Sequence, residues 1–130
     1  MPIASGTFTL QMKAEPGLDL GDGAQTGSFR FDKQFDGALE ATSVVQMISG
    51  GNPATGSAAY VAIERIAGTL DGRAGSFMTC HRGIMDGGSV SLEVDVVPGS
   101  GGDALEGIRG RMTIRIDAGV HHYALDYTLA

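Results

Sequence analysis

Glu64 and His81 are the two residues whose types and spacing could do chemistry in this sequence. They stand on either side of Asp71-Gly72, a dipeptide that favours a two-residue β-hairpin turn between two apolar runs. The register of that turn sets Glu64 and His81 as diagonal neighbours, roughly 7–8 Å apart at the backbone. An acid and an imidazole within side-chain reach can move a proton or orient a ligand.

The same register divides the Tyr60 to Arg82 hairpin into two faces. Two interpretations of an inward Glu64 stay open, because a buried carboxyl needs hydrogen bonds but also has its pKa raised toward neutrality. In one interpretation Glu64 is an acid–base or orienting partner of His81. In the other it forms a structural hydrogen bond that ties two strands together. One face carries Tyr60, Ala62, Glu64, Ile66, Phe77, Thr79 and His81, and the other carries Val61, Ile63, Arg65, Met78, Cys80 and Arg82.

Length and composition indicate one globular domain spanning residues 1–130. The 9 basic residues are scattered among 15 acidic ones, at a net charge of −6, so nucleic acid is not an expected partner. No run is long or apolar enough for a membrane span, and the N-terminus lacks a signal-peptide pattern, so we expect a cytoplasmic protein. The one cysteine, Cys80, has no disulfide partner and is expected to be a small buried apolar residue.

Alternating apolar residues predict eight strands separated by glycine-rich turns. Glu15 to Gly27 reads as a long loop, Gly50 to Pro53 as a strand break, and Asp103 as the cap of one helical turn through Leu105. A second two-residue turn at Ala118-Gly119 sets Arg111 beside Asp126 as a surface pair. The same turn sets Met112 by Leu125, Ile114 by Tyr123, Ile116 by His121 and Arg115 by His122.

Eight antiparallel strands with one apolar face each can close as an up-and-down barrel or stack as a sandwich. The pattern alone does not decide between them. In the barrel, one common interior holds Phe8, Leu10, Phe29, Phe31, Leu92, Val94, Ile114 and Leu125.

Five segments of the chain are distinctive as a set: S-G-T-F from Ser5, the run from Tyr60 to Phe77, His81 with Gly83, V-V-P-G-S-G from Val96, and L-D-Y-T-L from Leu125. Together they resemble a bacterial domain-of-unknown-function family, number 3224. Members of that family look like small β-barrels related to allene oxide cyclase, and G-T-L-D-G-R-A-G is similar to a hairpin of plant dirigent proteins. The resemblance implies an all-β, eight-stranded antiparallel barrel with at most one short helical turn, and a lumen that takes apolar small molecules.

Other chemical leads are weaker. His121 lies on an apolar face near the barrel mouth, and His122 points outward. Neither forms a readable metal-ligand set with His81 or a carboxylate, so no metal or other cofactor is expected. The glycine-rich Pro98 to Gly107 segment lacks the Lys-Ser/Thr ending of a phosphate-binding loop and reads as a barrel-end loop.

Three functions follow for such a barrel. The first is binding of an apolar small molecule in the lumen, the second is a cofactor-free isomerase or cyclase with Glu64 and His81 as catalytic residues, and the third is a filled barrel with a structural role. Because the strand from Ala59 to Ala67 is apolar on both faces except for Glu64 and Arg65, we also expect a homo-oligomer whose interface includes Val61 or Ile63. The predicted ligand-binding residues are Tyr60, Glu64, Phe77, His81, His121 and Tyr123.

Overall fold

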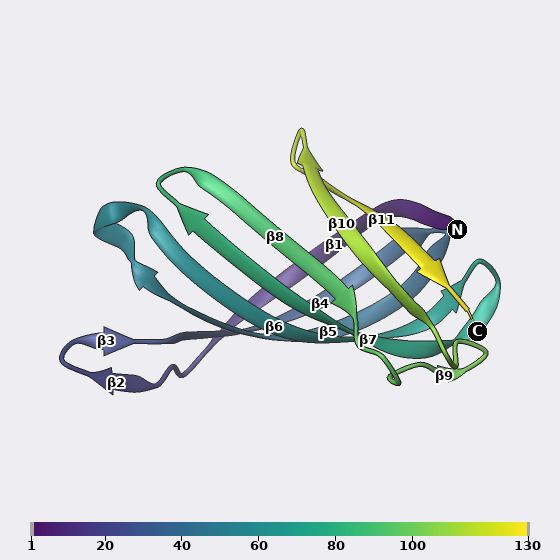
Figure 1. The fold of residues 1–130 in the computed structure, drawn as a ribbon, viewed down its shortest axis with the longest axis horizontal. Helices are drawn as coiled ribbons and strands as arrows, with labels where there is room; N and C mark the ends of the chain where they lie inside the picture. The colour runs from purple at the N-terminus through teal and green to yellow at the C-terminus, as the bar shows by residue number, and fades with distance from the viewer. Residues whose placement is uncertain (1, 130) are drawn as a thin grey trace.

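The computed structural model describes residues 2–129 as a closed, eight-stranded antiparallel β-barrel (Figure 1). Each long strand pairs with the next one along the barrel, and β1 pairs with β11 to close the ring. The predicted barrel is therefore confirmed. Its eight strands are β1 (Ile3–Glu15), β4 (Gly27–Gly37), β5 (Leu39–Asn52), β6 (Ser57–Leu70), β7 (Arg73–Asp86), β8 (Ser89–Val96), β10 (Arg109–Asp117) and β11 (Val120–Thr128).

Both predicted hairpin registers are confirmed. Glu64 lies opposite Thr79, and Ile114 lies opposite Tyr123. Asp71 and Gly72 have φ values of 48° and 83°, the pair of positive angles that the tightest hairpin turn requires.

The predicted faces are confirmed as well. On the β6–β7 hairpin, Glu64, Ile66, Phe77 and Thr79 are at most 1% exposed, whereas Val61 and Ile63 on the outer face are 53% and 49% exposed. Of the eight residues predicted to share the interior, Leu92 is the most exposed at 36%.

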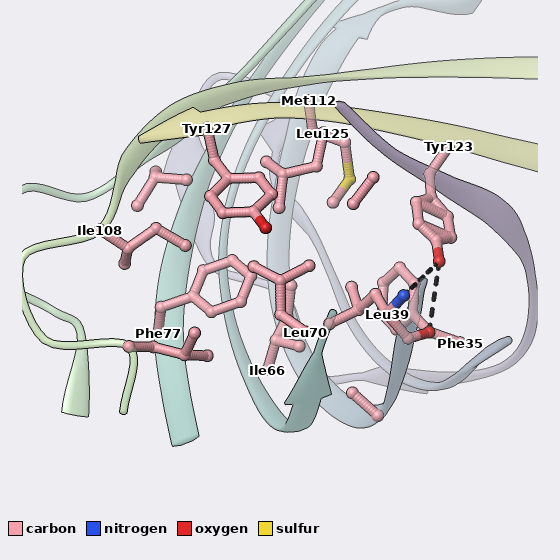
Figure 2. Close-up of a cluster of buried hydrophobic side chains, with 14 of the residues drawn as sticks. Phe35, Leu39, Ile66, Leu70, Phe77, Ile108, Met112, Tyr123, Leu125 and Tyr127 are labelled. Atoms are coloured by element: carbon pink, nitrogen blue, oxygen red, sulfur yellow. Dashed lines mark hydrogen bonds between the residues drawn. The ribbon is translucent and has the colours of Figure 1, made fainter. Parts of the chain in front are cut away.

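One end of the barrel is filled by side chains (Figure 2). The connection from β8 to β10 carries the short strand β9 (Gly102–Asp103), which pairs with β7, and it places Leu105 and Ile108 fully inside. The Tyr127 hydroxyl donates a hydrogen bond to Asp71 at the β6–β7 turn. This end therefore holds the main hydrophobic core, which includes Phe35, Leu39, Ile66, Leu70, Phe77, Met112, Tyr123, Leu125 and Tyr127.

The other end is open and its rim is apolar. Three residues near this end point to the interior side of their strands and are nevertheless exposed: Met12 at 60%, Val90 at 68% and Ile116 at 65%. The strands β8 and β10 pair through only two residue pairs, Val94–Met112 and Asp95–Arg111, and diverge beyond them toward this end (Figure 1). Near the open end, a side chain on the interior face of its strand is therefore not always buried.

Three local predictions are corrected by the structure. The segment from Glu15 to Gly27 is not an open loop, because Asp22-Gly23 forms a turn between β2 (Asp19–Gly21) and β3 (Ala24–Gln25). The strand β5 continues through Gly50 because it stays paired with β6 up to Asn52–Ser57. Asp103 caps no helix, since its φ is 55° and it pairs with Gly75; the helical turn is a 3₁₀ turn at Pro53–Thr55.

Two side-chain predictions are also wrong. Arg111 lies opposite Asp126 as predicted, but its guanidinium binds Asp95 on the other neighbouring strand, at 3.1 Å. Cys80 is exposed, because its position on β7 faces outward. Within residues 2–129, the structure has no helix with the length and apolar character of a membrane span.

Candidate functional site

The open half of the barrel contains a cavity of about 200 Å³ that is lined by all eight long strands. Because every strand contributes at least one inward side chain, the cavity is the lumen of the barrel. Ten of its thirteen lining residues are apolar or aromatic. The lining consists of Phe8, Leu10, Phe31, Lys33, Val45, Met47, Tyr60, Ala62, His81, Leu92, Ile114, Ile116 and His121.

Beside this cavity, Glu64 is fully buried and accepts hydrogen bonds through both carboxyl oxygens. His81 Nε2 lies 2.8 Å from Oε1, and the Thr79 hydroxyl donates to the same oxygen at 3.2 Å. The Ser43 hydroxyl donates to Oε2 at 2.5 Å, and Lys33 Nζ lies 3.4 Å from that atom. The predicted contact between Glu64 and His81 is therefore confirmed.

These five polar side chains come from four consecutive strands of the barrel wall. Lys33 on β4 lies opposite Ser43 on β5, and Glu64 on β6 lies opposite Thr79 on β7. His81 follows Thr79 by two residues and so shares its face. Strand pairing alone brings the group together, without any loop.

The surroundings of Glu64 keep it ionised. Burial by itself raises the pKa of its carboxyl, but the hydrogen bond from His81, the charge of Lys33 and the hydrogen bond from Ser43 together lower that pKa to about 2, from an ordinary value of 4.5. Because a buried carboxylate is stable only when its charge and lone pairs are matched, this group depends on its donors.

Lys33 supplies the balancing positive charge. Its side chain is 7% exposed, and besides contacting Glu64 its ammonium lies 4.5 Å from the centre of the Phe8 ring and 5.7 Å from that of Phe35. Aromatic faces attract a cation, so these rings stabilise Lys33 inside the barrel. The charged pair is neutral overall, which allows it to lie in an apolar interior.

The ionised carboxylate also sets the state of His81. A carboxylate oxygen can only accept, so Nε2 carries the hydrogen in this contact, and in the neutral imidazole the lone pair lies on Nδ1. Within the described residues, no side chain or backbone group bonds to Nδ1. His81 also lines the cavity, and in this neutral form Nδ1 is its ring nitrogen with a free lone pair.

The structure places the remaining predicted ligand-binding residues in two groups. Tyr60 and His121 line the cavity, and His121 packs against the Phe8 ring at 5.0 Å between centroids. Phe77 and Tyr123 lie in the core at the filled end instead. The Tyr123 hydroxyl accepts from Leu39 N at 2.9 Å and donates to the Asp36 carbonyl oxygen at 3.0 Å, so it holds the β4–β5 turn (Figure 2 shows the contact with Leu39).

Two members of the polar group were missed by the sequence analysis. Lys33 occupies the inward phase between Phe31 and Phe35, and Ser43 occupies the inward phase between Ala41 and Val45. Lys33 could have been found, because it is a charged residue at a position where the alternating pattern of the strand has apolar residues. No such signal exists for Ser43, because serine is common on either face of a strand.

Comparison with known proteins identifies relatives of the whole chain. The model of the family described as "Protein of unknown function (DUF3224)" matches residues 4–127. A crystal structure of a DUF3224 protein of unknown function from Shewanella oneidensis MR-1 is 39% identical, with a TM-score of 0.93, over 100% of this chain and 98% of that chain. No curated protein matches the sequence.

We predict that Glu64→Gln flattens the pH dependence of stability. Because the folded pKa is lower than the unfolded one, the carboxylate stabilises the fold fully above about pH 4.5, and that contribution is lost as the pH falls toward 2. The full contribution corresponds to about 3 kcal/mol, at about 1.4 kcal/mol per pH unit, and about 2 kcal/mol of it is lost by pH 3. Urea unfolding at pH 7, 4.5 and 3 measures it.

Glu40→Gln is the matched control, since Glu40 is exposed on the neighbouring strand β5. Its pH profile should stay parallel to that of the wild type. Equal profiles for Glu64→Gln and the wild type would show that Glu64 is not held as a buried carboxylate.

Proposed function

Since the chain belongs to the DUF3224 family, whose description gives no function, we propose from the site that this barrel binds a small, mostly apolar molecule in its open half. The observation that carries the proposal is a lumen with apolar walls that is also lined by His81, whose ring is held by Glu64 through Nε2 and whose Nδ1 is left for a ligand. Small-molecule sites commonly combine apolar walls with a few convergent polar groups.

The size of the cavity limits the ligand. A volume of about 200 Å³ corresponds to about seven water molecules at about 30 Å³ each. It is smaller than the roughly 300–1,000 Å³ of typical drug-sized sites. A molecule of about seven non-hydrogen atoms therefore fills the part of the lumen next to His81.

The polar groups define the head of the ligand. A hydroxyl or another neutral donor can give a hydrogen bond to His81 Nδ1, whereas Glu64 and Lys33 already satisfy each other. The partly buried Tyr60, whose pKa is raised by burial, keeps its hydroxyl proton and lines the same cavity. We therefore propose a ligand with one proton-donating head and an apolar body.

Two further observations support a binding barrel. A purely structural barrel has no need of a hollow half, and here only one end is filled by core side chains. The resemblance of the central hairpin to allene oxide cyclase and dirigent proteins also agrees with an apolar ligand.

The cytoplasmic location stays a prediction.

Titration with 1-hexanol, which has seven non-hydrogen atoms, tests the proposal. Followed by ¹H–¹⁵N NMR, it should shift the resonances of cavity residues. His81→Gln keeps an N–H for Glu64 but loses the acceptor at the position of Nδ1. The Kd of this variant for 1-hexanol should therefore rise about 2- to 13-fold, which corresponds to the loss of one hydrogen bond.

The same substitution at an outward-facing position, His122→Gln, is the control and should leave the Kd unchanged. Equal values of Kd for the two variants, or no shift of cavity residues in the wild type, would contradict the proposal.

A second candidate is proton transfer at the same site, in a cofactor-free isomerase or cyclase. The observation that favours it is the 2.8 Å contact through which Glu64 orients His81, the arrangement of a general base and its orienting carboxylate. In such a step Nδ1 takes a proton from the carbon beside a carbonyl group, the electrons of that C–H bond form a C=C bond, and the carbonyl π electrons move onto the oxygen. Lys33 also lines the cavity and supplies a positive charge for that enolate.

Deuterium exchange tests this second candidate. Cyclohexanone in D₂O should lose its α-hydrogens at least about tenfold faster with the wild type than with buffer, because Nδ1 removes a proton and returns a deuteron. His81→Gln should abolish the acceleration and His122→Gln should retain it, as measured by ¹H NMR. Equal exchange rates with wild type and His81→Gln would contradict proton transfer by His81, and ligand binding would remain the proposed function.

We also propose that the outer wall of β5, β6 and β7 binds a second copy of the chain. Its apolar side chains, defined here as the outer apolar wall, are contiguous and 37–53% exposed. A two-fold axis across the strands at Ile63 sets Val44 against Ile48 of the second copy and Arg65 against its Val61, so like charges stay apart. The outer apolar wall consists of Val44, Ile48, Val61, Ile63 and Met78.

Light scattering after size exclusion tests this association at micromolar concentration. The wild type should have a mass above the 13.4 kDa of one chain. Ile63→Lys, which places a charge at the centre of the wall, should give monomers, and Thr113→Lys on the exposed face of β10 should not. A monomeric wild type would overturn the proposal.

A further inference from the structure

We propose that the ligand is elongated, with its head at His81 and its apolar chain running past Tyr60 into a second subsite on the extended wall of β4, β5, β6 and β7. This inference rests on the proposed function. The second subsite is a recess of about 470 Å³, defined here as the mouth recess. It is lined chiefly by Gly27, Ser49, Gly51, Ala58 and Met85.

The mouth recess is the next layer of the same lumen. Ser49 follows the cavity residue Met47 by two positions, and Ala58 precedes the cavity residue Tyr60 by two positions. Because side chains two apart share a face of a strand, both recess residues point to the interior side. Ser49 also pairs directly with Tyr60, so cavity and recess meet at this pair.

The recess exists because the side chains in this layer are small. Gly51 pairs with Ala58, and Ala58 pairs with Met85, which is 45% exposed. The backbone of these strands is engaged in ladder pairing, so its polar groups do not need water. A surface of glycine Cα atoms, Ala58 and Met85 can therefore cover an apolar chain.

Tyr60 stands at the boundary between the two subsites. A Cβ added at Gly83, its partner on β7, would lie 2.2 Å from Tyr60 Cε1, so the ring rests directly on the Gly83 backbone. On its other side Tyr60 has only Ser49 as a cross-strand neighbour. The Tyr60 ring thus lies against β7, and on β4 the Phe29 ring lies against Gly27, the partner of Ser49, so the passage over Ser49 runs between these two rings.

A series of straight-chain alcohols from 1-hexanol to 1-decanol tests the second subsite. The first six carbons fill the cavity, and each further methylene that is buried in the recess should tighten binding about fourfold. Ala58→Ile places a larger, branched side chain where the recess meets the cavity and should weaken this dependence on length while leaving the Kd of 1-hexanol unchanged. Ala59→Ile makes the same change on the exposed face of β6 and should retain the dependence.

The outcomes separate this inference from the function on which it rests. If 1-hexanol binds and longer alcohols bind no better, or if Ala58→Ile retains the length dependence, the recess is not a subsite and the lumen site stands. If no alcohol binds, both fail. Ser49→Val, a β-branched substitution in the same layer, provides a second recess variant with the same expected weakening should Ala58→Ile not fold.

Discussion

The buried carboxylate of Glu64 is the constraint on which the interior of this barrel depends. An ionised carboxyl that is fully enclosed requires a donor for each lone pair and a compensating charge. Here Ser43, Thr79, His81 and Lys33 meet that requirement from four consecutive strands. A slip of one residue in any of these strands would turn its donor to the outer face, so the polar group also specifies the register of the wall.

The same group separates the two halves of the interior. On one side lie Ile66 and Phe77, both 1% exposed, and beyond them the side chains that fill the barrel end. On the other side lies the cavity, which reaches the open rim. The carboxylate therefore forms a structural hydrogen bond between the strands, and its role in orienting His81 for a ligand stays a proposal.

Local turn chemistry explains how much of this arrangement could be predicted. Asp71-Gly72 and Ala118-Gly119 each determine the residue pairing of their own hairpin. The pairing set by Asp71-Gly72 is sufficient to predict the Glu64–His81 contact from the sequence alone. Periodicity, however, reports only which face a residue takes and not how deep it lies. For that reason Leu92, which was predicted to share the interior, is 36% exposed, and Val90 and Met12 lie exposed at the rim although they point to the same side.

Features that depend on strands distant in sequence could not be predicted in the same way. Arg111 has an aspartate opposite it on each side, Asp126 on β11 and Asp95 on β8, and the pairing of β8 with β10 is not encoded in a short turn. Two of the donors to Glu64 were missed for a related reason. Lys33 and Ser43 reach Glu64 only because β4, β5 and β6 are adjacent in the closed sheet.

The central claim is that Glu64 holds His81 with its Nδ1 lone pair available to a ligand in the lumen. Long-range ¹H–¹⁵N NMR of histidine-labelled protein measures this most directly, because it distinguishes the two ring nitrogens and their protons. The account predicts that neutral His81 is protonated on Nε2 in the free protein and that 1-hexanol shifts the Nδ1 resonance toward that of a hydrogen-bonded nitrogen. A proton on Nδ1, or an Nδ1 resonance that saturating 1-hexanol does not move, would contradict it.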